Sequence, residues 1–161
     1  GSDQTCPPVT RFVGEAFTWL SWPAGASDVD ACSRLLFAQS TRGTEVYDDA
    51  RALLGRPDVT FIDLRDPREL WREGGMPGAV NVTRGMLEFW IDPSSPYHKD
   101  FFASGNRFVF FCAGGWRSAL AAKTAQDMGL TPVAHLHGGF GAWKKSGAPV
   151  ATIEPKPAHS A

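Results

Sequence analysis

The segment "FCAGGWRSALAA", from Phe111 to Ala122, combines residue types that can carry out nucleophilic chemistry on an anionic substrate. Cys112 follows an apolar run that is typical of a buried strand, and Arg117 and Ser118 open a run of strong helix formers. In sheets of parallel strands, ligands bind outside the carboxyl ends of the strands. The sequence therefore predicts a thiol at such an end, between a strand and a helix.

The residues behind the cysteine suit an anion-binding loop. Gly114 and Gly115 allow a tight fold, including backbone conformations with positive φ. Successive N–H groups can then converge in front of a helix N-terminus, and Arg117 adds a permanent positive charge. Because helix N-termini and nearby cations favour a thiolate, we predict that Cys112 is a nucleophile that holds a transferred group covalently. The alternative is a small buried side chain at a strand end, the ordinary role of a free cysteine.

The elements around this loop alternate between short apolar strands and helices. Strands are expected over residues 58–64, 78–82, 107–112 and 132–136, and helices over residues 44–55, 66–75, 84–90, 117–128 and 140–147. Such alternation favours a parallel sheet covered on both faces, with right-handed crossovers. The predicted fold class is therefore α/β, a three-layer sandwich with helices on both faces of a mostly parallel sheet.

Length and composition favour one such domain. The chain has 161 residues, of which 43% are hydrophobic. Residues 43–150 are predicted to form the domain, 1–42 an arm of unknown role beginning with a tag-like Gly-Ser, and 151–161 a flexible tail. The net charge of −1 comes from scattered charges, and no apolar run is long enough to span a bilayer. Neither nucleic acid nor a membrane is expected as a partner.

The cysteine count bears on the compartment. Because the chain has three cysteines, Cys6, Cys32 and Cys112, at least one thiol is free. Unpaired Cys6 and Cys32 favour a cytoplasmic protein, whereas a disulfide between them would indicate an oxidising compartment such as the periplasm.

Several segments together resemble one family. "CAGGWRSALAA" resembles the active-site loop of rhodanese-like sulfurtransferases, a C-x-x-G-x-R-S segment before a helix. "FIDLRDPREL" is similar to the family's D-x-R-x-x-x-E segment through Asp63, Arg65 and Glu69. "GGMPGAVNV" is similar to its G-H-I-P-G-A-x-N segment, and "VAHLHGGFGAWKKSGAPV" to its closing L-x-G-G-x-x-x-W segment. The motifs occur in the family's order over residues 44–150.

The resemblance implies a five-stranded sheet and a reaction that needs no metal or organic cofactor. Cys112 would take a sulfane sulfur from a small donor, thiosulfate or a persulfide, and become a persulfide itself. The acceptor would be cyanide or a thiol, including a thiol on a protein. The anion-binding loop would consist of Ala113, Gly114, Gly115, Trp116, Arg117 and Ser118, whose backbone N–H groups form the cradle.

The loop departs from the family pattern at its first position. Many members carry Arg or Lys directly after the cysteine, where this chain has Ala113, and Trp116 adds an aromatic wall. These departures favour a thiol-based or protein donor over thiosulfate. Arg84, in the segment expected to form the pocket rim, is predicted to supply the missing charge.

Two alternatives stay open. Cysteine-dependent phosphatases of the same fold resemble C-x-x-x-x-x-R, whereas Arg117 comes one position earlier here. A shorter loop favours a single sulfur atom over a phosphoryl group. A regulatory or sulfur-carrier module without turnover is the second alternative.

Other polar residues have structural interpretations. Asp63, Arg65 and Glu69 are expected to form a salt-bridged support beneath the loop instead of acid–base catalysts. His135 and His137 have the spacing of one strand face, but no cysteine or carboxylate cluster accompanies them, so no metal site is predicted.

Overall fold

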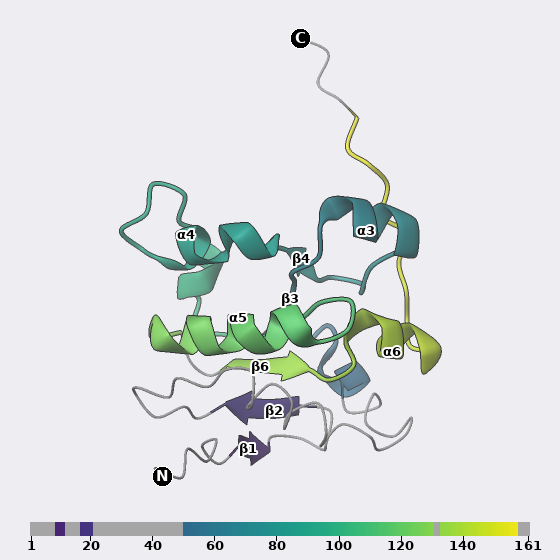
Figure 1. Cartoon of the computed structure of the whole chain (residues 1–161), viewed down its shortest axis with the longest axis horizontal. Helices are drawn as coiled ribbons and strands as arrows, with labels where there is room; N and C mark the ends of the chain where they lie inside the picture. Colours follow the sequence, from purple (N-terminus) through teal and green to yellow (C-terminus); the bar gives the residue numbers. More distant parts are fainter. Residues whose placement is uncertain (1–8, 12–16, 21–49, 131–132, 158–161) are drawn as a thin grey trace, which may run out of the picture.

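The structure is a computed structural model that describes residues 9–11, 17–20, 50–130 and 133–157. Its strands form a single sheet in the order β1-β2-β6-β5-β3-β4. The strands are β1 (Val9–Arg11), β2 (Phe17–Leu20), β3 (Val59–Asp63), β4 (Val80–Asn81), β5 (Arg107–Phe111) and β6 (Val133–Leu136). Figure 1 shows β6, β2 and β1 following one another at one end of the sheet, below α5 (Trp116–Asp127).

Four neighbouring strands, β4, β3, β5 and β6, run parallel. Their register pairs Ile62 with both Val80 and Phe110, and Phe110 with His135. The carboxyl ends of these strands therefore meet at one edge, where Cys112 follows β5. This confirms the α/β class and the four strands predicted over residues 58–136.

The sheet differs from the implied five strands. β2 pairs antiparallel with β6, and β1 pairs antiparallel with β2, so that the described part of the sheet has six strands. Both added strands lie in the range interpreted as an arm, residues 1–42. They are only 3 and 4 residues long, and pairing with the far edge of β6 is a long-range contact that local periodicity does not reveal.

Four of the predicted helices are present at nearly the predicted bounds: α3 (Pro67–Glu73), α4 (Leu87–Ile91), α5 and α6 (Gly139–Lys145). Of the helix predicted over residues 44–55, the described part is helical over residues 50–53, and residues 44–49 lie outside the described residues. A 3-10 turn, η1 (Arg84–Met86), leads into α4. A second, η2 (Asp100–Ala103), lies between α4 and β5, where neither a helix nor a strand was predicted.

Successive strand residues divide the core between two faces. One cluster includes Phe108, Phe110 and Cys112, and it packs against α4 and α5. The other includes Val109 and Phe111, and it packs against α6 and the helix at 50–53. Because adjacent residues of β5 enter opposite clusters, helices cover both faces and the molecule has the predicted three layers.

The chain after α6 returns to the domain. Gly75 and Ala151 exchange backbone hydrogen bonds of 2.8 and 2.7 Å. The Trp143 indole N–H donates to Pro149 O at 2.8 Å. The predicted tail, 151–161, therefore begins with a residue that is paired to the domain.

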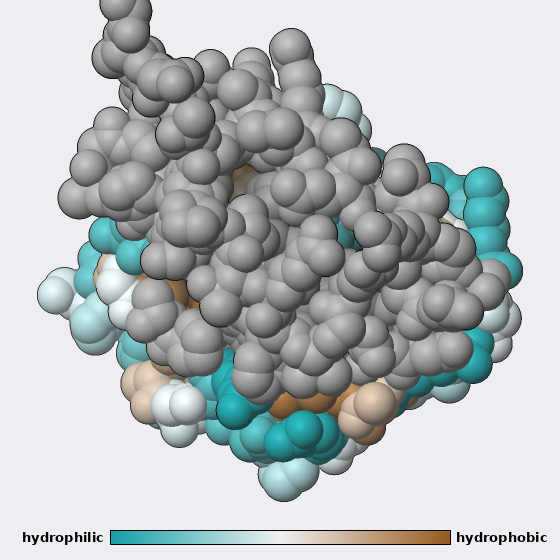
Figure 2. All heavy atoms as spheres, turned by 90° about the horizontal axis from the view of Figure 1, so that it is seen from below, coloured by the Kyte–Doolittle hydropathy of each residue, from teal (hydrophilic) through white to brown (hydrophobic). Residues whose placement is uncertain are grey.

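The described surface is mixed in hydropathy. Figure 2 shows hydrophilic and hydrophobic residues side by side along the margin of the face seen from below. Within the described ranges, no helix combines the length and the apolar character needed to cross a bilayer.

The tight seat of α5 on the sheet gives a testable prediction. Ala119, Ala121, Ala122 and Ala125 are all at most 3% exposed, so α5 approaches the strands closely. We expect Ala122→Leu to overpack this contact and lower the free energy of unfolding by about 1–3 kcal/mol. Urea denaturation measures the change. Leu120→Ala on the exposed side of the same helix is the control and should cost less than about 1 kcal/mol; equal losses would contradict the close packing.

Candidate active site

Cys112 lies directly after β5 and is 1% exposed beneath the loop that leads into α5. The Gly115 N–H donates to Cys112 Sγ at 3.1 Å. Gly115 is the N-terminal cap residue of α5, with φ of 104°, a conformation that a residue with a Cβ rarely adopts. Glycine at this position therefore lets the backbone turn its N–H onto the sulfur as the helix begins.

The loop is fixed from outside by α6. The Phe140 N–H donates to Cys112 O at 2.8 Å, and the Gly141 N–H donates to Ala113 O at 3.0 Å. In a planar trans peptide the C=O and N–H groups point in opposite directions. Since both carbonyls face α6, the N–H groups of Ala113 and Gly114 face away from it. Together with the first N–H groups of α5, they can donate to an anion.

Gly139 makes this contact possible. Its φ is 61°, and a Cβ placed there would lie 2.4 Å from Cys112 O and 2.6 Å from Ala113 O. Any side chain would therefore push α6 away from the loop. The Gly138-Gly139 pair in the closing motif thus has a physical reason, which is the approach of one backbone to another.

Arg117 lies beside the loop and is held by Glu69. Its guanidinium donates to both carboxylate oxygens, at 2.9 and 3.0 Å. Glu69 also accepts the Asp66 N–H at 2.8 Å, which completes the capping box of α3. The hydrogen bonds with Glu69 raise the pKa of Arg117, with a smaller contribution from Cys112. The charge of Arg117 is thus largely balanced before any anion binds.

Asp63 and Arg65 form a buried pair below the loop, each 1% exposed. The guanidinium of Arg65 donates to the Asp63 carboxylate at 2.7 Å and to Gly74 O at 3.0 Å. It also lies 4.0 Å from the ring centroid of Phe140. The pair therefore connects the ends of β3 and α3 with the first turn of α6, the turn that holds the loop. Glu69, predicted with them, instead contacts Arg117.

Arg84 reaches the same edge of the sheet through its backbone. Its N–H donates to Leu64 O at 3.2 Å, and the Leu64 N–H donates to Phe111 O at 2.9 Å. Its side chain, however, donates to Glu88 at 2.7 Å. Arg84, which was predicted to supply the positive charge that Ala113 lacks, is therefore paired with the carboxylate of Glu88 one helical turn further on.

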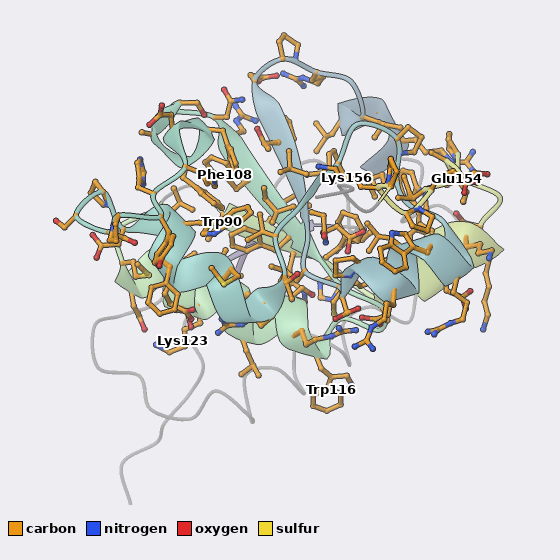
Figure 3. All side chains as sticks on the ribbon, turned by 90° about the horizontal axis from the view of Figure 1, so that it is seen from above. Trp90, Phe108, Trp116, Lys123, Glu154 and Lys156 are labelled. Atoms are coloured by element: carbon orange, nitrogen blue, oxygen red, sulfur yellow. The ribbon has the colours of Figure 1, made fainter. Side chains whose placement is uncertain are left out.

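The mouth of the loop is apolar. Ala113 and Gly114 are exposed, and the Trp116 side chain is 54% exposed. Figure 3 shows Trp116 projecting away from the ribbon at the start of α5. A substrate that approaches the loop therefore meets an aromatic ring and a methyl group.

Ser118 and His135 lie behind the cysteine, and both are completely buried. Ser118 Oγ is 3.7 Å from Cys112 Sγ, and it is 3.3 Å from His135 Nδ1. Burial, reinforced by His137, lowers the pKa of His135 to about 3. From the sequence alone, His135 was considered only as a metal ligand, and its contact with Ser118 was not predicted. Among the described residues, no group of three or more His, Cys, Asp or Glu side chains is placed to hold a metal.

The disulfide alternative concerns Cys6 and Cys32, which lie outside the described residues. Cys112 is a free thiol.

This arrangement of fold and loop coincides with a family match. Residues 46–146 match the rhodanese-like domain family. Since this is more than half of the chain, the protein belongs to that family.

Individual relatives agree with the assignment. A mouse protein named thiosulfate sulfurtransferase/rhodanese-like domain-containing protein 3 is 27% identical over 124 residues, which cover 74% of this chain and 78% of the relative. A structure from Rhodopseudomonas palustris, of a protein of unknown function described as a possible tyrosine phosphatase, is 55% identical. It has a TM-score of 0.63 and covers 68% of this chain and 95% of its own.

A more distant structure supports the fold alone. Thiosulfate sulfurtransferase from Pseudomonas aeruginosa is 22% identical with a TM-score of 0.55, over 80% of this chain and 23% of that one.

The hydrogen bonds from α6 to the loop carbonyls give a testable prediction. Gly139→Ala should break the hydrogen bonds to the loop carbonyls, because its Cβ would lie 2.4 Å from Cys112 O. Hydrogen–deuterium exchange of the peptide containing residues 112–118 should therefore accelerate. Gly129→Ala is the matched control, since Gly129 also has positive φ (90°) but nothing within 4 Å of the added Cβ. Equal exchange in both variants would show that these hydrogen bonds do not order the loop.

The Arg117–Glu69 pair predicts a pH dependence of stability. Hydrogen bonds from Arg117 hold the pKa of Glu69 below its usual 4.5, so the stabilisation by the pair is complete above about pH 4.5. It is lost as the pH falls through the lowered pKa of the folded state. Glu69→Gln keeps an acceptor for the Asp66 N–H and removes the charge. We expect a loss of about 1 kcal/mol at pH 7 that disappears in acid, measured by urea denaturation from pH 3 to 8. A pH-independent loss would contradict this origin.

Proposed function

We propose that the protein is a sulfurtransferase in which Cys112 carries the transferred sulfur as a persulfide. The observation that supports this most is the position of the Cys112 sulfur, which accepts the Gly115 N–H at 3.1 Å inside a loop whose carbonyls face α6. A sulfur anion held there gains several backbone donors. A free thiol at a strand end without such a cradle would be an ordinary buried side chain.

The reaction proceeds in two displacements without net oxidation. The Cys112 thiolate attacks the outer sulfur of the donor, the donor's S–S bond breaks, and the leaving group departs with that electron pair. Cys112 then holds the sulfur through a new S–S bond. An acceptor thiolate or cyanide attacks the terminal sulfur, and the electron pair of the breaking bond returns to Cys112.

Local charge favours a persulfide of a thiol, whose reacting group brings at most one negative charge to the loop, over the thiosulfate dianion. Arg117 is engaged by Glu69 and Arg84 by Glu88. Ala113 supplies no cation, and the mouth carries the exposed ring of Trp116. A dianion would therefore lose its hydration shell without gaining an unpaired counter-charge. The acceptor in this proposal is a thiol, on a small molecule or on a protein.

Names of relatives support the same reaction. Besides the mouse protein, a protein from Allochromatium vinosum that is 27% identical over 105 residues is named sulfurtransferase.

A module that only carries sulfur would share the persulfide but lack fast discharge to an acceptor.

A phosphatase is the second candidate, and the Rhodopseudomonas palustris protein favours it through its description as a possible tyrosine phosphatase. The spacing between Cys112 and Arg117 argues against it, since the loop is one residue shorter than C-x-x-x-x-x-R. A phosphatase would also bind its substrate through an arginine whose fork of donors is here occupied by Glu69.

The proposal is tested by intact mass spectrometry after incubation with a donor. A glutathione persulfide should add one sulfur atom to the protein, cyanide should remove it, and Cys112→Ser should prevent it. Thiosulfate should load more slowly. No gain from either donor, with hydrolysis of an aryl phosphate by the unmodified chain, would favour the phosphatase instead.

A matched pair of variants tests donor choice. Ala113→Lys adds a cation at the mouth and should speed loading from thiosulfate by about tenfold, the effect of roughly 1.4 kcal/mol of added attraction. It should change loading from the persulfide little. Ala113→Met adds similar length without charge and is the control. Equal loading by both variants would show that charge does not select the donor.

A further inference from the structure

A buried row of polar side chains runs from Cys112 through Ser118 to His135, and the sulfur-transfer steps described above do not use His135. Cys112 Sγ lies 3.7 Å from Ser118 Oγ, which lies 3.3 Å from His135 Nδ1. Ser118 lies on α5 and His135 on β6, and both are 0% exposed. A buried imidazole this close to the reacting sulfur calls for a functional explanation.

The hydrogen bonds of Ser118 determine which ring nitrogen of His135 carries the proton. The Ser118 hydroxyl lies 3.0 Å from Gly115 O. A carbonyl only accepts, so the single O–H of Ser118 donates there. His135 must then donate through an Nδ1–H. Its Nε2 is in that tautomer an acceptor only, in keeping with its lack of a hydrogen-bond partner among the described residues. The opposite tautomer would bury an N–H without an acceptor, which is more costly.

We propose that His135 is a positioning residue that directs the hydroxyl proton of Ser118 toward the sulfur anion of Cys112. While Cys112 is a neutral thiol, its S–H donates to Ser118 Oγ. When that proton leaves to solvent, the hydroxyl rotates and donates to the sulfur. The Nδ1–H of His135 continues to donate to Ser118 Oγ and prevents the hydroxyl from turning toward the imidazole.

The carbonyl that Ser118 releases keeps a partner. Gly115 O also accepts the Ala119 N–H at 3.1 Å, so rotation of the hydroxyl leaves no buried carbonyl unpaired. No covalent bond other than S–H changes in this step, and no oxidant is needed.

Its surroundings keep His135 neutral while it acts. Burial lowers its pKa to about 3, and the ring centroid of His137 lies 4.8 Å away. On the Cys112 side of Ser118, the charged groups among the described residues include Arg117 on α5, which interacts with Cys112, and its partner Glu69 on α3. Because the imidazole does not gain a proton near neutral pH, it acts through a fixed hydrogen bond and not as a general base. The inference rests on the proposed function only in that Cys112 is the nucleophile.

The test is the pH dependence of alkylation of reduced Cys112 by iodoacetamide, followed on the Cys112 peptide by mass spectrometry in the full chain. His135→Leu and Ser118→Ala each remove a hydrogen bond that supports the anion. Each should move the pH midpoint upward by about one unit, roughly a tenfold change. The double variant should move it no further. His135→Asn, whose amide can replace the Nδ1–H donor, should stay close to the unmodified protein.

Three results with the His135 and Ser118 variants would overturn the inference. They are an unchanged midpoint in His135→Leu, an equal shift in His135→Asn, or additive shifts in the double variant. His137→Asn is the control for loss of the neighbouring buried imidazole, and a shift as large as that of His135→Leu would also overturn the inference. Because alkylation requires no sulfur donor, failure of sulfur transfer would leave this result readable, and Ser118→Ala keeps the test available if His135→Leu does not fold.

Discussion

The structure depends on a backbone contact between two elements that are distant in sequence. The first turn of α6 donates to the carbonyls of Cys112 and Ala113 at 2.8 and 3.0 Å. Without this contact, few interactions would fix the orientation of the loop N–H groups, because the loop itself contains few side chains that could do so. The contact needs Gly139, and it also needs Arg65 beneath Phe140, 4.0 Å from the ring centroid. Motifs far apart in the sequence therefore serve one loop.

The charges around the loop are arranged in pairs. Arg65 forms a buried ion pair with Asp63, and Arg117 forms a partly exposed ion pair with Glu69. Burying the first pair gives little net stability, because desolvation offsets most of the attraction. Its geometry, however, fixes the spacing between β3, α3 and α6. The proposed binding of an anion by the loop therefore relies mainly on backbone dipoles, which are rigid and do not titrate.

The sequence was informative where neighbouring residues act together. The strand before Cys112, the glycines behind it and the helix after it could be predicted because strand, turn and helix each have a local pattern. The pairing of β2 with β6 could not, since short strands far from their partner carry no register information. The partners of Arg117 and Arg84 were missed for a related reason, because a charged residue in a sequence does not reveal which carboxylate will engage it. From the sequence, His135 was recognised only as sharing a strand face with His137, and its contact with Ser118 depends on how closely α5 packs on β6.

These features together describe a site whose framework changes little near neutral pH. The pKa of His135 is about 3, and Arg117 lowers that of Glu69 while its own is raised. The backbone donors of the loop carry no titratable proton at all. A framework of this kind suits a reaction in which a sulfur anion forms twice in each cycle, because neither the cradle nor its supports must reorganise when the charge arrives or leaves.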